Sequence, residues 1–264
     1  MALAAAANPR SSSRAVVVGV STYQDSLHSV LPEARTNAEL FAAFLRSRSG
    51  GLLPADLVHL LTDEQATLAQ LTTTLALVQE ESKPGDEIVL YFSGQARMFS
   101  GEKGECPILY FHDSPAAAGD VGTLSLSALL YSLQDYCAKN SISYRIFLDL
   151  QMLPQPRLPQ QVWPLWMDAF EATYPAAWVV EARGKAGQKE TLTRLAIDGA
   201  LGLADWNGDE RVDLKEGFRY LKDGSRFISR GSAFFSAFSE KYGLLSESTP
   251  APSKDPQNAY LTDE

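Results

Sequence analysis

The sequence predicts an α/β fold in which helices cover both faces of a mainly parallel β-sheet. Short runs of β-branched and aromatic residues alternate along the chain with longer segments of helical periodicity, and this alternation is typical of β-α-β units. Several of the short runs are apolar almost throughout, as strands covered on both faces are. The chain has 264 residues, of which 45% are hydrophobic and 21% charged, so it is long enough to enclose such a core in one domain.

The predicted strands are these short apolar runs, and the predicted helices are the periodic segments between and after them. The strands cover residues 15–20, 57–62, 87–93, 107–111, 144–150 and 176–182, and the helices cover residues 32–47, 64–81, 125–138, 190–203 and 214–221. In the first helix Ala38, Phe41 and Leu45 recur on one face, as in an amphipathic helix. Pro32 suits its first turn, because the backbone N–H that proline lacks has no partner there.

The domain organisation follows from composition at the two ends of the chain. Residues 1–13 contain an alanine run without a charged segment before it, so they predict a disordered leader rather than a signal peptide. Residues 14–246 form the predicted domain, and the polar residues 247–264 form a tail. No apolar run approaches the ~20 residues that a membrane helix needs.

Charge and cysteine content restrict the partners and the compartment. The formal net charge of −9 argues against nucleic acid or an anionic membrane as the main partner, because either would be repelled. The two cysteines, Cys106 and Cys137, are too few for a disulfide framework and fit a reducing compartment. We therefore expect a cytoplasmic protein.

Two predicted strand ends carry the segments of greatest interest, because open α/β sheets place their sites at the carboxyl ends of strands. These are YFSGQA at 91–96 and FLDLQML at 147–153. With AVVVGVSTYQD at 15–25 and PGDEIVLYFSG at 84–94, they resemble bacterial caspase and metacaspase-type cysteine peptidases (peptidase C14 type) over nearly the whole chain from Arg14. The resemblance implies a caspase-like three-layer αβα sandwich with a mainly parallel central sheet.

At the two positions that define the activity, this sequence departs from that family. The family has its catalytic histidine in a Y-F-S-G-H-G segment and its nucleophile in a D-x-C-H-S-G segment, where this chain has Gln95 and Gln151. A cysteine peptidase needs a thiolate and an imidazole that protonates the leaving amine. A glutamine amide neither attacks a carbonyl nor titrates near neutral pH. We therefore predict a pseudoenzyme, with Gln95 and Gln151 facing each other across neighbouring strand ends.

The residues around the two glutamines differ from the family as well. Ala96 replaces the second glycine of the histidine loop, and the residues at 152–154 replace the H-S-G that follows the nucleophile. Asp149 matches the family aspartate two residues before the nucleophile, so the resemblance implies a vestigial pocket for a basic side chain. The alternative is a carboxylate that satisfies nearby backbone donors.

An acidic segment at 205–216 has the ligand spacing of an EF-hand loop. The predicted Ca²⁺ ligands are Asp205, Asn207, Asp209, the Arg211 carbonyl oxygen and Glu216, with Asp213 at the ninth loop position. The sixth position, normally glycine because the backbone turns there with positive φ, is Glu210. Asx residues also form tight turns without a metal, so the loop has a purely structural interpretation too.

The sequence leaves three functions open. The first is a non-catalytic, caspase-like interaction or regulatory protein that binds a protein partner, of which an active paralogue is one candidate. The second is an active hydrolase with an unrecognised nucleophile, and the third is a Ca²⁺-responsive module. No cofactor other than Ca²⁺ is expected, and neither nucleic acid nor a membrane is expected as a partner.

Overall fold

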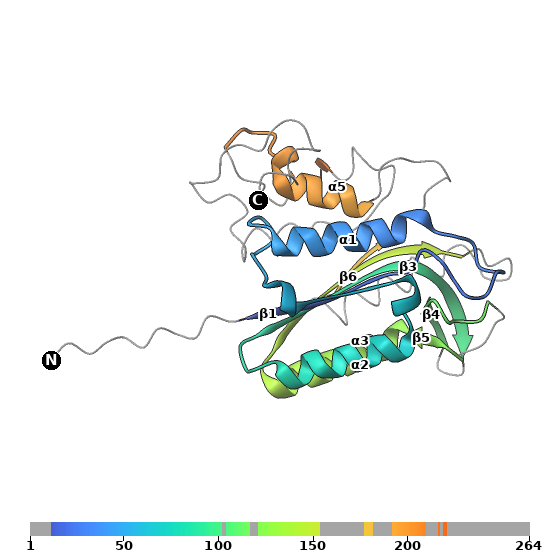
Figure 1. Ribbon diagram of the computed structural model, residues 1–264. Helices are drawn as coiled ribbons and strands as arrows, with labels where there is room; N and C mark the ends of the chain where they lie inside the picture. The colour runs from blue at the N-terminus through green and yellow to red at the C-terminus, as the bar shows by residue number, and fades with distance from the viewer. Residues whose placement is uncertain are drawn as a thin grey trace.

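The chain folds into three layers, with helices on both faces of a central sheet (Figure 1). The computed structural model describes residues 12–101, 104–116, 121–153, 177–181, 192–209, 216 and 219–220. Helices α1 (Pro32–Arg46) and α5 (Leu192–Asp198) lie on one face of the sheet, and α2 (Leu68–Glu81) and α3 (Leu126–Asn140) lie on the other. The predicted α/β sandwich is confirmed.

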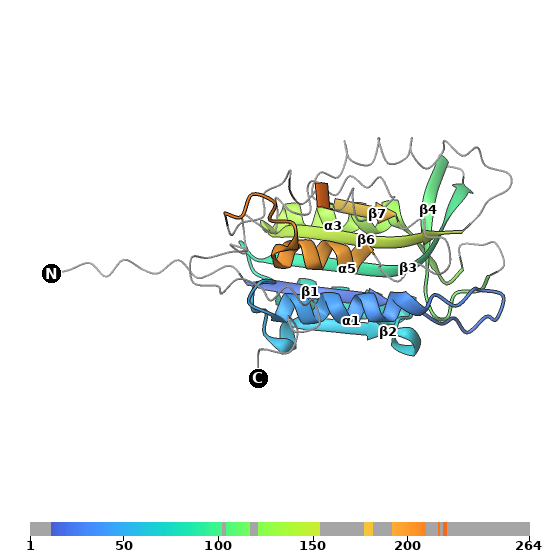
Figure 2. The ribbon, with the colours of Figure 1, turned by 90° about the horizontal axis from the view of Figure 1, so that it is seen from above.

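The sheet is mainly parallel, as predicted, and is organised around β3. Its strands are β1 (Ser13–Gly19), β2 (Val58–Thr62), β3 (Glu87–Gly101), β4 (Gly104–Tyr110), β5 (Thr123–Ser125), β6 (Ser143–Met152) and β7 (Ala177–Glu181). The first part of β3 pairs in parallel with β1 on one side and with β6 on the other, while β2 and β7 extend the two sides (Figure 2). From Ala96 onward β3 pairs with antiparallel β4, which in turn pairs with β5.

Alternating residues of the central strands build two apolar layers, because successive side chains of a strand point to opposite faces. Val16 and Leu90 belong to the cluster that packs against α2 and α3. Val17, Val89 and Tyr91 belong to the cluster that packs against α1 and α5. This alternation explains why the β1 and β3 segments are apolar almost throughout.

The amino-terminal ends of the parallel strands are joined by ion pairs. Asp86 Oδ2 lies 2.9 Å from Arg14 Nη1, and Glu87 Oε1 lies 2.8 Å from Arg145 Nε. Glu87 is nearly inaccessible to solvent, and a buried carboxylate needs such a partner because desolvation otherwise opposes its charge. The two adjacent acidic residues thus connect β3 to β1 and to β6 at the end of the sheet where these strands begin, far from Gln95.

Some element boundaries differ from the predictions for local reasons. The predicted helix 64–81 is divided into the short turn η2 (Asp63–Gln65) and α2, because the Thr67 hydroxyl accepts a hydrogen bond from the Gln70 N–H and caps α2 there. Continuous helix after 190 is also interrupted: α5 is followed by the π-helical segment η3 (Gly199–Leu203), in which Gly202 has φ 110°.

At the two ends of the chain, the structure tests only part of the predictions. β1 begins at Ser13, so the last residue of the predicted leader belongs to the sheet. Residues 1–11 of the leader, most of the predicted helix 214–221 and the tail 247–264 lie outside the described residues. Within the part of the chain that the structure describes, no helix is long and apolar enough to span a membrane.

The close approach of α1 to the end of β1 depends on Gly19. A Cβ atom placed on Gly19 would lie 2.6 Å from the Ala34 carbonyl oxygen and 2.6 Å from Ala38 Cβ. Real Cβ atoms do not approach backbone this closely, so a side chain here would force α1 away from the sheet.

We therefore expect Gly19→Ala to lower the free energy of unfolding by about 1–3 kcal/mol, the usual cost of overpacking a core. Urea denaturation measures the change. Thr72→Ala, on the exposed side of α2, is the control and should stay within about 0.5 kcal/mol of the wild type. Equal stability of Gly19→Ala and the wild type would contradict the packing argument.

Candidate functional site

The two glutamines that the resemblance places at catalytic positions lie side by side at the carboxyl ends of β3 and β6. Gln95 and Gln151 are register partners in the parallel pairing of these strands. Neighbouring strands are about 4.8 Å apart, and paired positions of parallel strands point to the same face of the sheet. The structure thus brings together the two residues that the resemblance associates with catalysis, on the face that α1 covers.

Gln95 is completely enclosed, and its polar groups are all engaged. Its exposed fraction is 0%. The backbone N–H donates to the Tyr23 hydroxyl at 3.0 Å, and the side-chain Nε2 donates to the Ser29 carbonyl oxygen at 2.7 Å. The side-chain Oε1 lies 3.1 Å from His28 Nδ1. Gln95 is therefore a buried side chain whose hydrogen bonds connect β3 to the segment that follows β1.

These contacts come from the segment 21–31 after β1, which we call the strap. Asp63 Oδ1 accepts hydrogen bonds from the N–H groups of Ser21 and Thr22 at 2.9 and 3.0 Å, which fixes the start of the strap. Farther along, Asp25 Oδ2 accepts from the Ala116 N–H at 2.8 Å. The strap thus crosses the carboxyl end of β3 and separates Gln95 from solvent.

His28 is a residue that the sequence analysis did not single out. The structure buries its ring between two aromatic side chains. The imidazole stacks on Tyr23 with ring centroids 4.5 Å apart and meets the Tyr110 ring edge-on at 4.8 Å. No spacing in the sequence relates His28 to Gln95 or to Tyr110, because the contacts come from three separate elements.

Gln151 differs from Gln95 in its surroundings. It is half-buried, and its Oε1 atom is buried without a hydrogen-bond partner. An unpaired buried carbonyl costs free energy. Of the two glutamines, only Gln151 therefore has a buried side-chain oxygen without a hydrogen-bond partner among the described residues.

Asp149 is enclosed by α1 and by the start of α5. Its Oδ2 accepts a hydrogen bond from Asn37 Nδ2 at 3.1 Å and another from the Thr193 hydroxyl, which also contacts the Tyr91 hydroxyl at 2.7 Å. Burial raises the pKa of Asp149 to about 6, although hydrogen bonds from Thr193 act in the opposite direction. A basic side chain could reach this carboxylate only by displacing Asn37 or Thr193.

The described part of the acidic loop is held by its own hydrogen bonds. Asp205 Oδ1 accepts from the Gly208 N–H at 2.8 Å, and Asn207 Oδ1 accepts from the Asp209 N–H at 2.7 Å. Glu216 Oε1 accepts from the Asn207 N–H at 3.1 Å and from the Trp206 N–H at 3.2 Å. Arg211 and Asp213 lie outside the described residues.

A metal-binding cluster is absent from the described residues: no three histidine, cysteine or acidic side chains among them converge closely enough to hold an ion. Gly208, at the fourth loop position, has the positive φ that the sequence analysis associated with the sixth. Calcium binding at 205–216 stays a prediction.

Neither thiol has the surroundings of an activated nucleophile. Cys137 lies buried on α3, and burial raises the pKa of its thiol to about 11, which disfavours the reactive thiolate. Cys106 Sγ lies 3.5 Å from Ser125 Oγ on the neighbouring strand β5. Among the described residues, neither sulfur atom is hydrogen-bonded to an imidazole.

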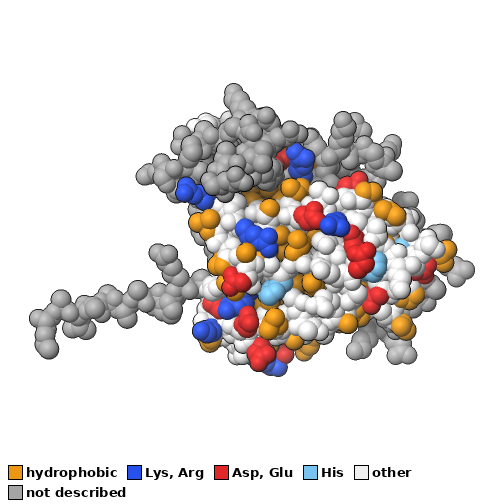
Figure 3. All heavy atoms as spheres, viewed as in Figure 1, with side chains coloured by type: hydrophobic (Ala, Val, Ile, Leu, Met, Phe, Trp, Pro, Cys, Tyr) orange, Lys and Arg blue, Asp and Glu red, His pale blue; other side chains and the backbone are white. Residues whose placement is uncertain are grey.

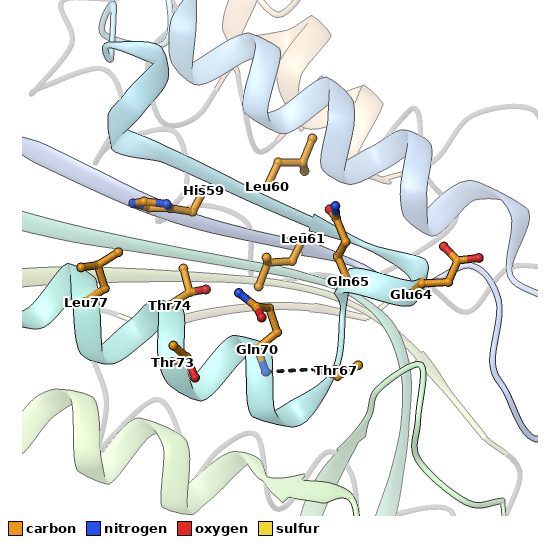
Figure 4. Close-up of a pocket in the computed structure, with 10 residues that line it drawn as sticks. All are labelled: His59, Leu60, Leu61, Glu64, Gln65, Thr67, Gln70, Thr73, Thr74 and Leu77. Carbon is orange, nitrogen blue, oxygen red and sulfur yellow. Dashed lines mark hydrogen bonds between the residues drawn. The ribbon is translucent and has the colours of Figure 1, made fainter.

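A groove of about 640 Å³ runs between β2 and α2, away from the two glutamines (Figure 4). Leu61 from the strand and Gln70 and Thr74 from the helix point into the space between them. It is lined by His59, Leu60, Leu61, Glu64, Gln65, Thr67, Gln70, Thr73, Thr74 and Leu77. The Nε2 atom of His59 is buried without a hydrogen-bond partner, so the groove contains an unused polar group.

Comparison with known proteins shows a similarity of fold. No protein-family model and no curated protein matches the chain. Protein GSU0716 from Geobacter sulfurreducens is 14% identical, with a TM-score of 0.51 over 81% of this chain and 89% of that chain. The structure of pro-sf-caspase-1 is 11% identical (TM-score 0.48, 81% and 77% covered), and caspase-1 from Spodoptera frugiperda is 10% identical (TM-score 0.46, 84% and 81% covered).

The raised pKa of Asp149 predicts a pH-dependent stability. Because the folded chain holds this proton more tightly than the unfolded chain, the contribution of Asp149 is fully present below the unfolded pKa of 3.8 and is lost as pH rises through about 6. Ionisation at neutral pH thus costs up to about 3 kcal/mol. Asp149→Asn should remove this cost, so that its stability relative to the wild type increases between pH 4 and 7.

Urea denaturation over that pH range provides the measurement, and Asp56→Asn, which changes an exposed carboxylate, is the matched control. The control should parallel the wild type at every pH. A constant difference between Asp149→Asn and the wild type across the range would exclude a titrating Asp149.

Proposed function

We propose that this protein is a non-catalytic, caspase-like protein that acts by binding a protein partner. The observation that carries the proposal is the state of Gln95: a fully buried amide with its backbone N–H and both side-chain polar atoms hydrogen-bonded. A general acid must reach the leaving group of a substrate, and an enclosed amide can neither reach it nor supply a proton. The motif resemblance supports the caspase-like relationship, and the similarity to solved structures supports the fold.

The partner we propose is an extended peptide segment of neutral or basic character, bound in the groove between β2 and α2. Among the described strands, β2 pairs only with β1, so its outer edge can add a further strand. Glu64 is the charged residue among those that line the groove, apart from the titratable His59, and the whole chain carries −9. On the face in Figure 3, the described acidic and basic side chains are interspersed and form no continuous basic surface for nucleic acid.

The first prediction of this proposal is that the protein hydrolyses no peptide substrate. Fluorogenic peptides with arginine, lysine or aspartate before the scissile bond, with and without Ca²⁺, provide the assay. The double substitution Gln95→His with Gln151→Cys should restore little or no activity, because position 95 lies beneath the strap and a misplacement of about 1 Å can cost on the order of a hundredfold.

Gln151→Ala is the control for that assay, since it removes the vestigial nucleophile position without introducing a thiol. Turnover by purified wild-type protein that persists in Gln151→Ala would overturn the non-catalytic interpretation. Labelling with a thiol-directed probe would then show whether Cys106 or Cys137 is the nucleophile.

The second prediction concerns the groove, and a phage-displayed library of random peptides is the probe. Selected peptides should bind the wild type and lose at least about tenfold in affinity for Leu77→Arg, because a long cationic side chain at the rim of the groove occupies its space. Tyr131→Arg places the same side chain on the exposed surface of α3 and should bind the peptides as the wild type does. Failure to select peptides, or equal affinity for Leu77→Arg, would contradict the proposed binding site.

A further inference from the structure

The strap is fastened by a histidine that makes polar contacts on both sides of its ring. His28 Nδ1 lies 3.1 Å from Gln95 Oε1, and His28 Nε2 lies 3.1 Å from the Ser114 carbonyl oxygen. The ring is 9% exposed, so water has little access to replace either contact. The donor and acceptor roles of these two contacts determine the protonation state of the ring.

The contact with Ser114 requires a proton on Nε2, because a carbonyl oxygen can only accept a hydrogen bond. The contact with Gln95 requires one on Nδ1, for a reason that involves Ser29. The far end of the Gln95 amide lies 2.7 Å from the Ser29 carbonyl oxygen, so the NH₂ group must be at that end and the amide oxygen must face His28. Turning the amide round would set two carbonyl oxygens against each other.

We propose that His28 is doubly protonated when the strap is closed, and that loss of one proton breaks one of its two polar contacts and loosens the strap over the carboxyl end of β3, where the contacts of Gln95 with Tyr23 and Ser29 remain. Neutral imidazole has one donor and one acceptor, so it leaves one of the two contacts with acceptor facing acceptor. Histidine is the side chain whose charge ordinarily changes between about pH 5 and 8, so pH is the variable that tests this proposal. This inference rests on the hydrogen bonds of the strap and is independent of the proposed binding function.

Charged and titratable groups around the ring are consistent with a cationic His28. On the strap, hydrogen bonds from the N–H groups of Ala116 and Leu27 lower the pKa of Asp25, which remains an anion near the imidazolium. Burial raises the pKa of Tyr23 and of Tyr110, so both stay neutral throughout this range. The stacked Tyr23 ring also favours a cation over its face.

Two further basic side chains, Arg97 and His112, lie near the strap and Tyr110. Arg97 on β3 places its guanidinium 5.6 Å from the centroid of the Tyr110 ring and is a positive charge that opposes a second one on His28. His112, which follows β4, is half-buried and donates from Nδ1 to the Thr22 carbonyl oxygen at 2.8 Å. A neutral His112 satisfies that contact, so deprotonation of His112 leaves its hydrogen bond intact.

Loosening is confined to the middle of the strap. Ser21 and Thr22 are held by Asp63, and the Gln24 N–H donates to the His112 carbonyl oxygen at 2.7 Å, without involving His28. The Asp25 carboxylate likewise stays bound to the Ala116 N–H, so the residues loosened by deprotonation are those at 26–30. These include Leu27 and Val30, whose side chains are 80% and 64% exposed and move with the strap.

The test uses the full chain, in which His28, His59 and His112 are the three histidines, so that single substitutions assign each ring. Nitrogen-15 NMR of the imidazoles should show protons on both ring nitrogens of His28 at about pH 6 and their loss by about pH 9. Over the same range, hydrogen exchange of the strap amides, corrected for the intrinsic pH dependence, should accelerate by at least about tenfold, the effect of losing one charged hydrogen bond. Amides of β1 should not change.

Three variants make the result specific to His28. His28→Gln should abolish the pH dependence of strap exchange, whereas His112→Gln, the matched control, should retain it. Gln95→Glu places a carboxylate beside Nδ1 and should move the midpoint upward by at least about one pH unit. A neutral His28 at about pH 6 with a protected strap would overturn the proposal, as would strap exchange that is unchanged up to about pH 9.

Discussion

The parallel pairing of β3 with β6 is the interaction on which the rest of the structure depends. It runs without interruption from Glu87–Ser143 to Ala96–Met152 and determines which residues emerge together at the carboxyl end of the sheet. A shift of one residue would turn every side chain of the strand to the opposite face. The buried pair of Glu87 with Arg145 opposes such a shift from the other end, because a displaced Glu87 would lose its cation in a site without water.

Within this register, an amide at position 95 allows an arrangement of the neighbouring elements that a catalytic histidine would not. A catalytic histidine has to remain accessible to substrate and solvent protons, whereas an amide at the same place can be enclosed, provided that its donors and acceptors are matched. The strap supplies that match at Gln95 through Ser29 and His28. At Gln151, by contrast, the buried Oε1 atom has no hydrogen-bond partner among the described residues, so the two glutamines differ in their surroundings.

Much of the fold could be predicted from the sequence because strands and helices are specified by patterns of neighbouring residues. Apolar runs and helical periodicity identified the parallel strands and the helices on both faces, and the motifs identified the pairing of Gln95 with Gln151. The continuation of β3 beyond Ser93 and the three-residue β5 were missed, because both depend on antiparallel pairing with β4 rather than on their own composition.

The surroundings of the candidate site were predictable only in part, for a related reason. Asp149 was recognised as a possible binding group, with backbone donors as its alternative partners. In the structure its hydrogen bonds come from Asn37, more than a hundred residues earlier in the chain, and from Thr193. His28 likewise acquires its role from Gln95 and Ser114, and no spacing in the sequence encodes such distant contacts.

The shortness of the edge strand β2 limits how far another chain can pair with it. Chains with open strand edges tend to polymerise, and β2 contains neither a proline nor a lysine to prevent this. Its protection is geometric: the 3₁₀ turns η1 (Ala55–Leu57) and η2 bend the chain away at both ends, so an added strand can align with no more than residues 58–62. Backbone pairing over so short a length gives little affinity by itself, and selectivity at this edge must therefore come from side chains.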